Sequence, residues 1–153
     1  MAWSVLTKSA HAMARKIVIV EDNPADAKTL RVALTRRDPE IETVVLENGA
    51  QALEYFANDE TPELVLLDLN LPLVSGFEVL EFLKSDPHLK RLPVVILSGS
   101  SNQQEIERCY AAGANSYICK PTGINQVFTM ASDLVSYWFE QAKLPKRFVA
   151  THT

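Results

Sequence analysis

The sequence predicts an α/β fold built on a parallel sheet of five strands. Short apolar runs of four or five residues alternate with segments of helical periodicity, and this alternation is typical of βαβ units. Two of the runs, at 64–67 and 94–97, are apolar at every position, as expected of strands that are covered on both faces. The length of 153 residues suits one domain with one core.

The five predicted strands lie near residues 16–21, 42–46, 63–68, 93–98 and 115–119. The second is more polar than the others. This composition indicates a strand at the edge of the sheet, where part of its surface faces solvent.

Five helices are expected between and after these strands, near residues 24–37, 48–58, 76–85, 102–112 and 124–141. The first starts with favourable chemistry, because Asn23 is a good N-cap and Pro24 suits the first helical position. Gly113 is expected to end the fourth helix, since glycine readily adopts the left-handed conformation common at helix ends.

The last predicted helix carries more aromatic surface than one core-facing stripe needs. Tyr137, Trp138 and Phe139 are consecutive, and at about 100° per residue they spread over roughly 200° of the helix circumference. At least one of these rings is therefore expected to face outward. An outward ring is either an isolated exposed aromatic, which is common, or part of a subunit interface.

Composition excludes several classes of protein. Apolar residues make up 47% and charged residues 22% of the chain, close to the average for soluble globular domains. No apolar stretch is long enough to span a bilayer, and at a net charge of −4 no basic stripe indicates direct nucleic-acid binding. The two cysteines, Cys109 and Cys119, fit a reducing cytoplasm, and each is expected to be a small core residue.

Three segments are expected along the chain. Residues 1–15 lack the continuous apolar stretch that secretion needs and are interpreted as an exposed N-terminal extension. Residues 16–141 form the folded domain, and residues 142–153 form a C-terminal tail whose few basic residues indicate a solvated end. With no output domain expected, the predicted output is binding to other proteins.

Polar residues follow three of the predicted strands. Asp68 comes directly after the apolar run 64–67, the pair Glu21-Asp22 follows the run 17–20, and Lys120 with Pro121 follows residues 117–119. In a parallel sheet these ends lie along one edge, which is where open α/β sheets place their ligands.

These residue types suit phosphoryl transfer to a carboxylate. The transfer needs a nucleophilic oxygen, a cation for the incoming oxygens and donors for the developing charge. Glu21, Asp22 and Asp68 offer the hard oxygen ligands that Mg²⁺ prefers, and Asn70 is placed to add its backbone carbonyl. Ser98, at the end of the fourth strand, offers a hydroxyl, while Lys120 supplies a positive charge.

Each of these residues has a simpler explanation when taken singly. Strand-end acids often cap the next helix, Ser98 and Asn70 suit turns, and Lys120 suits an exposed surface. Together the simpler explanations weaken, because several strand ends would have to carry the required residue type by chance.

The motifs at these strand ends resemble those of the receiver domains of two-component response regulators, over residues 16–140. Glu21-Asp22 is similar to the metal-binding acidic pair of that family, with Glu21 in place of the commoner Asp. Asp68, followed by 69–72 and Gly76, resembles the phosphoacceptor motif. Ser98, Tyr117 and the pair Lys120-Pro121 stand where the family has its Ser/Thr switch, aromatic switch and Lys-Pro pair.

The resemblance implies a doubly wound, flavodoxin-like (CheY-like) receiver fold with strand order 2-1-3-4-5. It also implies that a sensor histidine kinase phosphorylates Asp68 with Mg²⁺ or Mn²⁺ as cofactor, and that Ser98 and Tyr117 then rearrange. The protein would be a phosphoacceptor with slow self-dephosphorylation rather than an enzyme.

Four segments resemble more closely the stand-alone regulators paired with bacterial and cyanobacterial phytochromes. They are 21–24, 68–72, 85–93 and 137–145. This resemblance implies a phytochrome as kinase partner and a homodimer formed through the fourth helix, fifth strand and fifth helix. The aromatic residues 137–139 agree with that interface.

Three other functions compete with this interpretation. A haloacid-dehalogenase-type phosphatase needs a second Asp where Asn70 stands, and a flavin carrier needs a phosphate-binding loop where 23–26 stand. The third is a pseudo-receiver, an interaction module that takes no phosphate. The set Asp22, Asp68, Ser98 and Lys120 argues against it, although Glu21 leaves room for weak metal binding.

Overall fold

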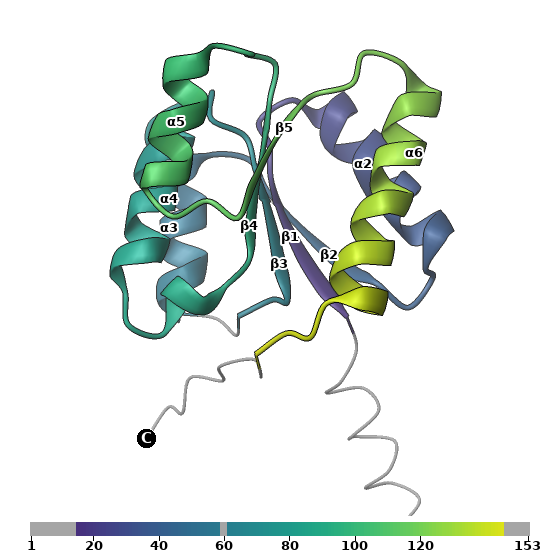
Figure 1. Cartoon of the computed structure of the whole chain (residues 1–153), viewed down its shortest axis with the longest axis horizontal. Coiled ribbons are helices and arrows are strands. Elements are labelled where there is room, and N and C mark those ends of the chain that lie inside the picture. The colour runs from purple at the N-terminus through teal and green to yellow at the C-terminus, as the bar shows by residue number, and fades with distance from the viewer. Residues whose placement is uncertain (1–14, 59–60, 146–153) are drawn as a thin grey trace, which may run out of the picture.

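The computed structural model describes residues 15–58 and 61–145 (Figure 1). The expected extension before Arg15 and the expected tail beyond Pro145 lie outside the described residues. No helix in the part of the chain that the structure describes is long and apolar enough to cross a membrane.

Five parallel strands form one sheet in the order β2-β1-β3-β4-β5, which confirms the predicted order. Their bounds are β1 (Lys16–Val20), β2 (Glu42–Leu46), β3 (Leu64–Leu67), β4 (Val94–Ser98) and β5 (Ser116–Cys119). As predicted, β3 and β4 are buried along their whole length, and the more polar β2 lies at one edge.

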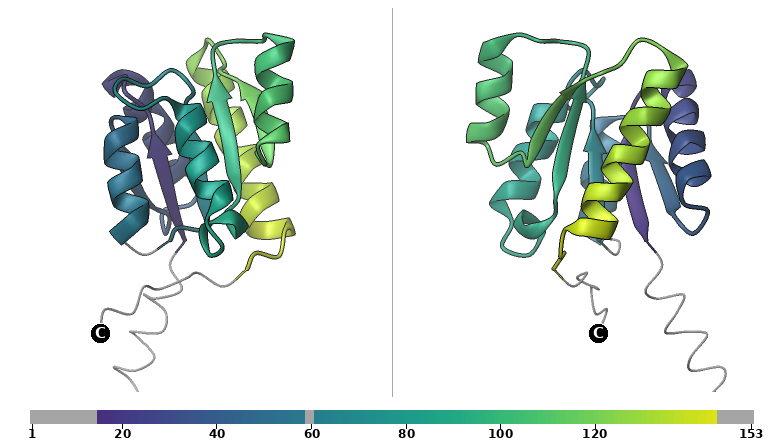
Figure 2. Two further views of the ribbon diagram at one scale, coloured as in Figure 1. Left: turned by 90° about the vertical axis from the view of Figure 1, so that its left-hand side faces the viewer. Right: turned by 45° about the vertical axis from the view of Figure 1, so that its right-hand side comes forward.

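Helices cover both faces of the sheet. On one face lie α2 (Pro24–Arg37) and α6 (Ile124–Val135), and on the other lie α3 (Gly49–Asn58), α4 (Gly76–Ser85) and α5 (Gln103–Ala111) (Figures 1 and 2). Successive side chains of a strand point to opposite faces, so Ile17 and Ile19 enter one core, while Val18 and Val20 enter the other.

The predicted helix ends are confirmed at two places. Asn23 caps α2, accepting hydrogen bonds from the N–H groups of Ala25 and Asp26, and Pro24 is the first helical residue. Gly113, with φ +107°, lies just beyond the end of α5.

The last helix differs from the prediction. It does not continue as an α-helix to residue 141, because α6 ends at Val135 and a π-helical turn, η2 (Ser136–Gln141), follows. Arg37 of α2 donates hydrogen bonds to Ser132 and Ser136 and pairs with Glu140. These contacts join the last helical segment to α2, and the periodicity of the sequence alone does not reveal the wider turn.

The aromatic residues of this turn divide as expected into outward and inward rings. Tyr137 is exposed, whereas Trp138 and Phe139 are half-buried and pack against the core between the sheet and the helices α2 and α6. The outward ring is therefore Tyr137.

The prediction for the two cysteines is half right. Cys109 is buried in the core, but Cys119 is exposed. Cys119 is the last residue of β5, which has a neighbouring strand on one side only and is less buried than β3 or β4. A short apolar sequence at an edge strand is thus no guarantee of burial.

Candidate functional site

Three strand ends are held side by side by backbone hydrogen bonds that extend the sheet by one residue. The N–H of Asp68 donates to the carbonyl of Val20 (3.0 Å), and the N–H of Lys120 donates to the carbonyl of Ser98 (2.8 Å). Glu21 is held in the same way by the carbonyl of Leu46 (2.9 Å). The sheet thus brings the side chains from the ends of β1, β3 and β5 to one edge.

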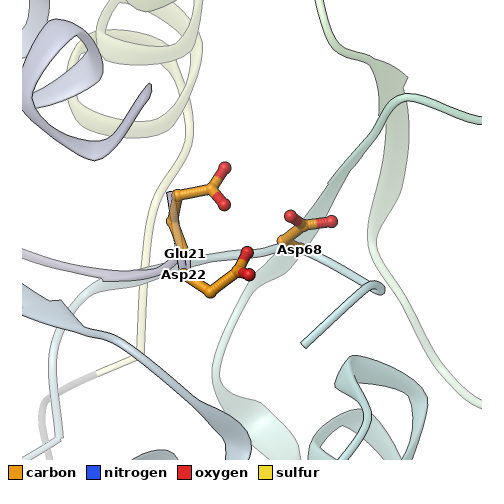
Figure 3. A group of neighbouring side chains, drawn as sticks. All are labelled: Glu21, Asp22 and Asp68. Carbon is orange, nitrogen blue, oxygen red and sulfur yellow. The ribbon is translucent and has the colours of Figure 1, made fainter. Parts of the chain in front are cut away.

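Three carboxylates converge at this edge (Figure 3). One oxygen from each of Glu21, Asp22 and Asp68 lies within 4.8 Å of the others, with Glu21 and Asp68 buried and Asp22 exposed. Three acids so close repel one another unless a positive charge compensates them. Their oxygens are the donors that divalent cations such as Mg²⁺ prefer, so this donor set fits such an ion.

Lys120 supplies positive charge to the same cluster. Its Nζ lies 2.5 Å from Oε1 of Glu21, 2.9 Å from Oδ2 of Asp68 and 3.8 Å from Oδ2 of Asp26. Burial lowers the pKa of Lys120, but the hydrogen bonds to Glu21 and Asp68 and the negative charges of both carboxylates together outweigh it, so its pKa is raised. The ammonium group therefore stays charged between the carboxylates.

The pKa of Glu21 is strongly shifted. Burial raises its pKa to about 7, the charge of Asp68 contributes in the same direction, and the hydrogen bonds from Lys120 and the N–H of Asn23 only partly offset both. The carboxylate is ionised at neutral pH only at a cost in desolvation. A second cation beside Glu21 would reduce that cost.

Both oxygens of Asp68 have a hydrogen-bond donor. Oδ1 accepts from the N–H of Asn70 (3.2 Å), and Oδ2 accepts from Nζ of Lys120 (2.9 Å). The carboxylate is thus held in one orientation at the end of a buried strand. Asn70 contacts it through its N–H, while the predicted ligand atom was its carbonyl oxygen.

The loop that follows Asp68 returns to it at Gly76. The N–H of Gly76 donates to the carbonyl of Leu69 (2.9 Å), and a Cβ at Gly76 would lie only 1.9 Å from the carbonyl oxygen of Asp68. Only glycine fits this approach. The Ser75 hydroxyl accepts from the N–H of Glu78, whose side chain accepts from the N–H of Ser75, so a capping box fixes the start of α4.

Ser98, whose carbonyl accepts from the N–H of Lys120, is linked to Tyr117 through the loop after β4. The fully buried Ser98 hydroxyl accepts a hydrogen bond from the N–H of Ser100 (3.2 Å), and the Tyr117 hydroxyl donates to the carbonyl of Ser100 (2.8 Å). The two side chains therefore share one backbone residue, although no carboxylate of the cluster is a hydrogen-bond partner of Ser98 within the described ranges.

The sequence prediction missed one charged residue near the site. Asp26 lies four positions after Asp22, in the first turn of α2, and comes within 3.8 Å of Lys120. An acidic residue in the first turn of the helix that directly follows the pair Glu21-Asp22 was the available signal. The aromatic residues 137–139, in contrast, are not brought to this site, because they lie in η2 at the end of α6 far from the strand ends (Figure 1).

Residues 17–132 match the model of a protein family that is described as the response regulator receiver domain. The match covers most of the chain and includes all the strand ends described above. It confirms the predicted family resemblance.

Individual relatives lead to the same family. The response regulator Rcp1 of Synechocystis sp. (strain ATCC 27184 / PCC 6803 / Kazusa) is 35% identical over 135 residues, which is 84% of this chain and 92% of that protein. The crystal structure of the phosphorylated cyanobacterial phytochrome response regulator RcpA is similar with a TM-score of 0.82 and 40% identity, covering 86% of this chain and 99% of that one.

A further solved structure is the Mn²⁺-bound form of Rcp1, with a TM-score of 0.78 and 34% identity, covering 86% of this chain and 99% of that one. Taken together, these similarities confirm the predicted receiver fold and the resemblance to phytochrome-associated regulators.

Proposed function

The chain belongs to the response regulator receiver domain family and is related to phytochrome response regulators, and from this we propose that Asp68 accepts a phosphoryl group from a sensor histidine kinase. The observation that carries the proposal is the position of Asp68, buried at a strand end between the acidic pair Glu21-Asp22 and the Lys120 ammonium. In the proposed function, the phosphorylated protein signals through altered binding to other proteins.

Mg²⁺ is the proposed cofactor of this reaction, and Glu21, Asp22 and Asp68 would hold it, with the backbone carbonyl of Asn70 as a further ligand. The convergence of three hard oxygen donors supports this choice, and Mn²⁺ is the alternative. When bound, the ion neutralises negative charge on the entering phosphoryl oxygens.

The chemistry assigned to the chain's own residues is a transfer between two covalent bonds. An oxygen of Asp68 attacks phosphorus, the bond from phosphorus to the donor nitrogen breaks, and the histidine takes up a proton as it leaves. Lys120 stabilises the phosphoryl oxygens, because its ammonium already lies 2.9 Å from Oδ2 of Asp68. Water later cleaves the acyl phosphate slowly, so the protein is a phosphoacceptor rather than an enzyme.

The proposed partner is a phytochrome histidine kinase. The phosphoryl transfer from this kinase to Asp68 takes place in the cytoplasm. Similarity to cyanobacterial phytochrome response regulators supports this partner. A direct contact with nucleic acid or membrane is not part of the proposal.

The signal leaves the site through Ser98 and Tyr117. A phosphoryl group adds about −1.5 to −2 charges and strong acceptor oxygens, which attract the Ser98 hydroxyl. Because Ser98 and Tyr117 both bond to Ser100, movement of one disturbs the hydrogen bond of the other. The surface around α5, β5 and α6 changes as a result.

That surface is also the proposed homodimer interface. A groove of about 780 Å³ lies between the edge strand β5 and α6, and Ile118, Met130, Tyr137 and Trp138 are among its lining residues. Phe139 lies in the same turn, η2. An apolar groove beside an unpaired strand edge suits a second copy of the chain.

The alternative function is a pseudo-receiver that binds partners without taking phosphate. The arrangement of Lys120 and the three acids disfavours it, because a module that only binds proteins has no need to bury two carboxylates together.

Intact mass after incubation with acetyl phosphate and Mg²⁺ tests the proposal. We expect the wild-type chain to gain one phosphate, and we expect no gain in Asp68→Asn or in a sample kept with a metal chelator. Equal labelling of Asp68→Asn would place the phosphate elsewhere and contradict the proposal.

A further inference from the structure

We propose that Leu73 is a direct contact for the protein that delivers phosphate to Asp68, and that it helps to determine which protein does so. The inference rests on the proposed function and assigns to this residue a role in partner choice. Its basis is a combination of exposure, backbone conformation and position that folding alone does not explain.

Leu73 is the most exposed of the large apolar side chains in the described part of the chain. Its exposed fraction is 83%, compared with 67% for Ile124, which ranks next. A single exposed leucine is common on protein surfaces. The backbone conformation makes this one unusual.

Leu73 has φ +70°, and no other non-glycine residue among those described has a positive φ. The N–H of Val74 donates to the carbonyl of Pro72 (2.9 Å), which closes a three-residue turn around Leu73. A γ-turn with positive φ at its centre is rare and strained. Glycine or asparagine would adopt this conformation at lower cost, so leucine is a poor choice for folding and for solubility.

The loop cannot easily relax this strain, because both sides of the turn are packed. A Cβ at Gly49 would lie 2.0 Å from the carbonyl oxygen of Val74, and a Cβ at Gly76 would lie 1.9 Å from that of Asp68. The capping box of Ser75 and Glu78 holds the next residues. The backbone that carries Leu73 is therefore held in place, and its side chain extends into solvent.

The position of Leu73 indicates what it contacts. It lies at the tip of the loop that leaves Asp68 and returns to it at Gly76, so a protein that brings a phosphohistidine to Asp68 passes over this loop. An apolar side chain on a backbone that is already held in place binds an apolar surface with little loss of backbone conformational entropy. A small donor such as acetyl phosphate has no protein surface that could contact Leu73.

The test compares two donors on three proteins. The wild type, Leu73→Asn and Leu73→Met are each given acetyl phosphate with Mg²⁺, and separately a panel of purified, autophosphorylated phytochrome histidine kinases. Asn accepts the positive φ and removes the apolar surface, whereas Met keeps the surface and is the matched control. The initial rate of Asp68 phosphorylation is measured in each case, with thermal unfolding as a check on folding.

We expect all three proteins to react with acetyl phosphate at the same rate. With the kinase that phosphorylates the wild type, transfer to Leu73→Asn should fall about tenfold, as expected from the loss of a buried leucine contact, while Leu73→Met stays within about twofold. Leu73→Asn should be at least as stable as the wild type, because it relieves strain.

Other results overturn the inference. If the kinase phosphorylates Leu73→Asn and the wild type at the same rate, Leu73 is not part of the interface. If Leu73→Asn loses the same fraction of its rate with both donors, the substitution has damaged the site around Asp68 itself. A wild type that reacts with acetyl phosphate and with no kinase of the panel contradicts a protein phosphodonor at Leu73. A wild type that reacts with neither donor contradicts the proposed function, and this inference falls with it.

Discussion

Glu21 and Asp68 share the ammonium group of Lys120, and this arrangement determines the net charge of the site when no metal is bound. Both carboxylates are buried, and Nζ of Lys120 lies within 2.9 Å of each. One ammonium charge cannot neutralise two carboxylates, so a net negative charge remains, to which Asp22 adds. At the scale of single residues, this remaining negative charge lowers the stability of the folded state and attracts cations.

The pKa of Glu21 makes this cost measurable. Unfolded, the group ionises near 4.5, and folded it ionises near 7, so between these values the folded state binds more protons. In a metal chelator, the free energy of unfolding should therefore fall as the pH rises from about 5 to about 8, by on the order of 2 kcal/mol from this residue. Urea unfolding at a series of pH values measures it.

The variant Glu21→Gln should lack this part of the pH dependence and should be more stable than the wild type at pH 8. Glu40→Gln is the matched control, because Glu40 is exposed and distant in sequence from the site. If Glu21→Gln and the wild type lose stability in parallel as the pH rises, Glu21 does not bind the proton.

The roles of single residues were predictable where the residue type has few chemical functions. The acids at 21, 22 and 68 and the lysine at 120 have few alternatives at the ends of apolar runs, and the structure brings them together. The conformation of Leu73 was not predictable, because leucine carries no preference for positive φ. Nor does the sequence reveal that the N–H of Asn70 is the group that contacts Asp68.

The loop between β3 and α4 is the element on which the position of Asp68 depends. Gly76→Ala should destabilise the protein by roughly 3 kcal/mol, because its Cβ would lie 1.9 Å from the backbone that carries Asp68. The same variant should accept phosphate from acetyl phosphate more slowly than the wild type. Thermal unfolding and intact mass measure the two effects.

Gly99→Ala is the control for this loop, since a Cβ at Gly99 would meet nothing within 4 Å. It should change the free energy of unfolding by no more than about 0.5 kcal/mol. If the two glycine variants lose the same stability, the close approach of Gly76 to Asp68 has no energetic consequence.

Elements were predictable wherever local signals agreed. The strands have short apolar runs between turn signals and α2 has a strong N-cap, so the bounds of these elements differ from the prediction by one residue at most at either end. The π-helical turn η2 was not predictable, because the apolar periodicity used to predict the helix 124–141 does not distinguish a π-helical turn from a continuing α-helix. The exposure of Cys119 depends on the place of β5 in the sheet.

Across the whole molecule, the reactive edge of the sheet and the aromatic turn η2 lie at opposite ends of α6 (Figure 1). In the proposed function, one end receives the phosphoryl group and the face formed by α5, β5 and α6 contacts a second copy. If both proposals hold, this separation would leave the kinase and the second copy with different binding surfaces.

Tyr137 is the residue through which this interface is best tested, because it is exposed whereas Trp138 is half-buried in the core. Tyr137→Ser should weaken self-association in sedimentation equilibrium without lowering the thermal stability of the monomer. Trp138→Ala should lower that stability as well, which makes it the less specific variant. A wild type that remains monomeric both with and without acetyl phosphate would remove the proposed interface.

The central claim is that the side chain of Asp68 forms an acyl phosphate, and reductive trapping measures this bond most directly. After acetyl phosphate and Mg²⁺ treatment, borohydride reduces an aspartyl phosphate to homoserine, which tandem mass spectrometry locates in the sequence. The proposed function predicts homoserine at position 68 in the wild type and none in a sample treated with a chelator. Phosphate trapped at another residue, or full labelling without reducible acyl phosphate at position 68, would contradict it.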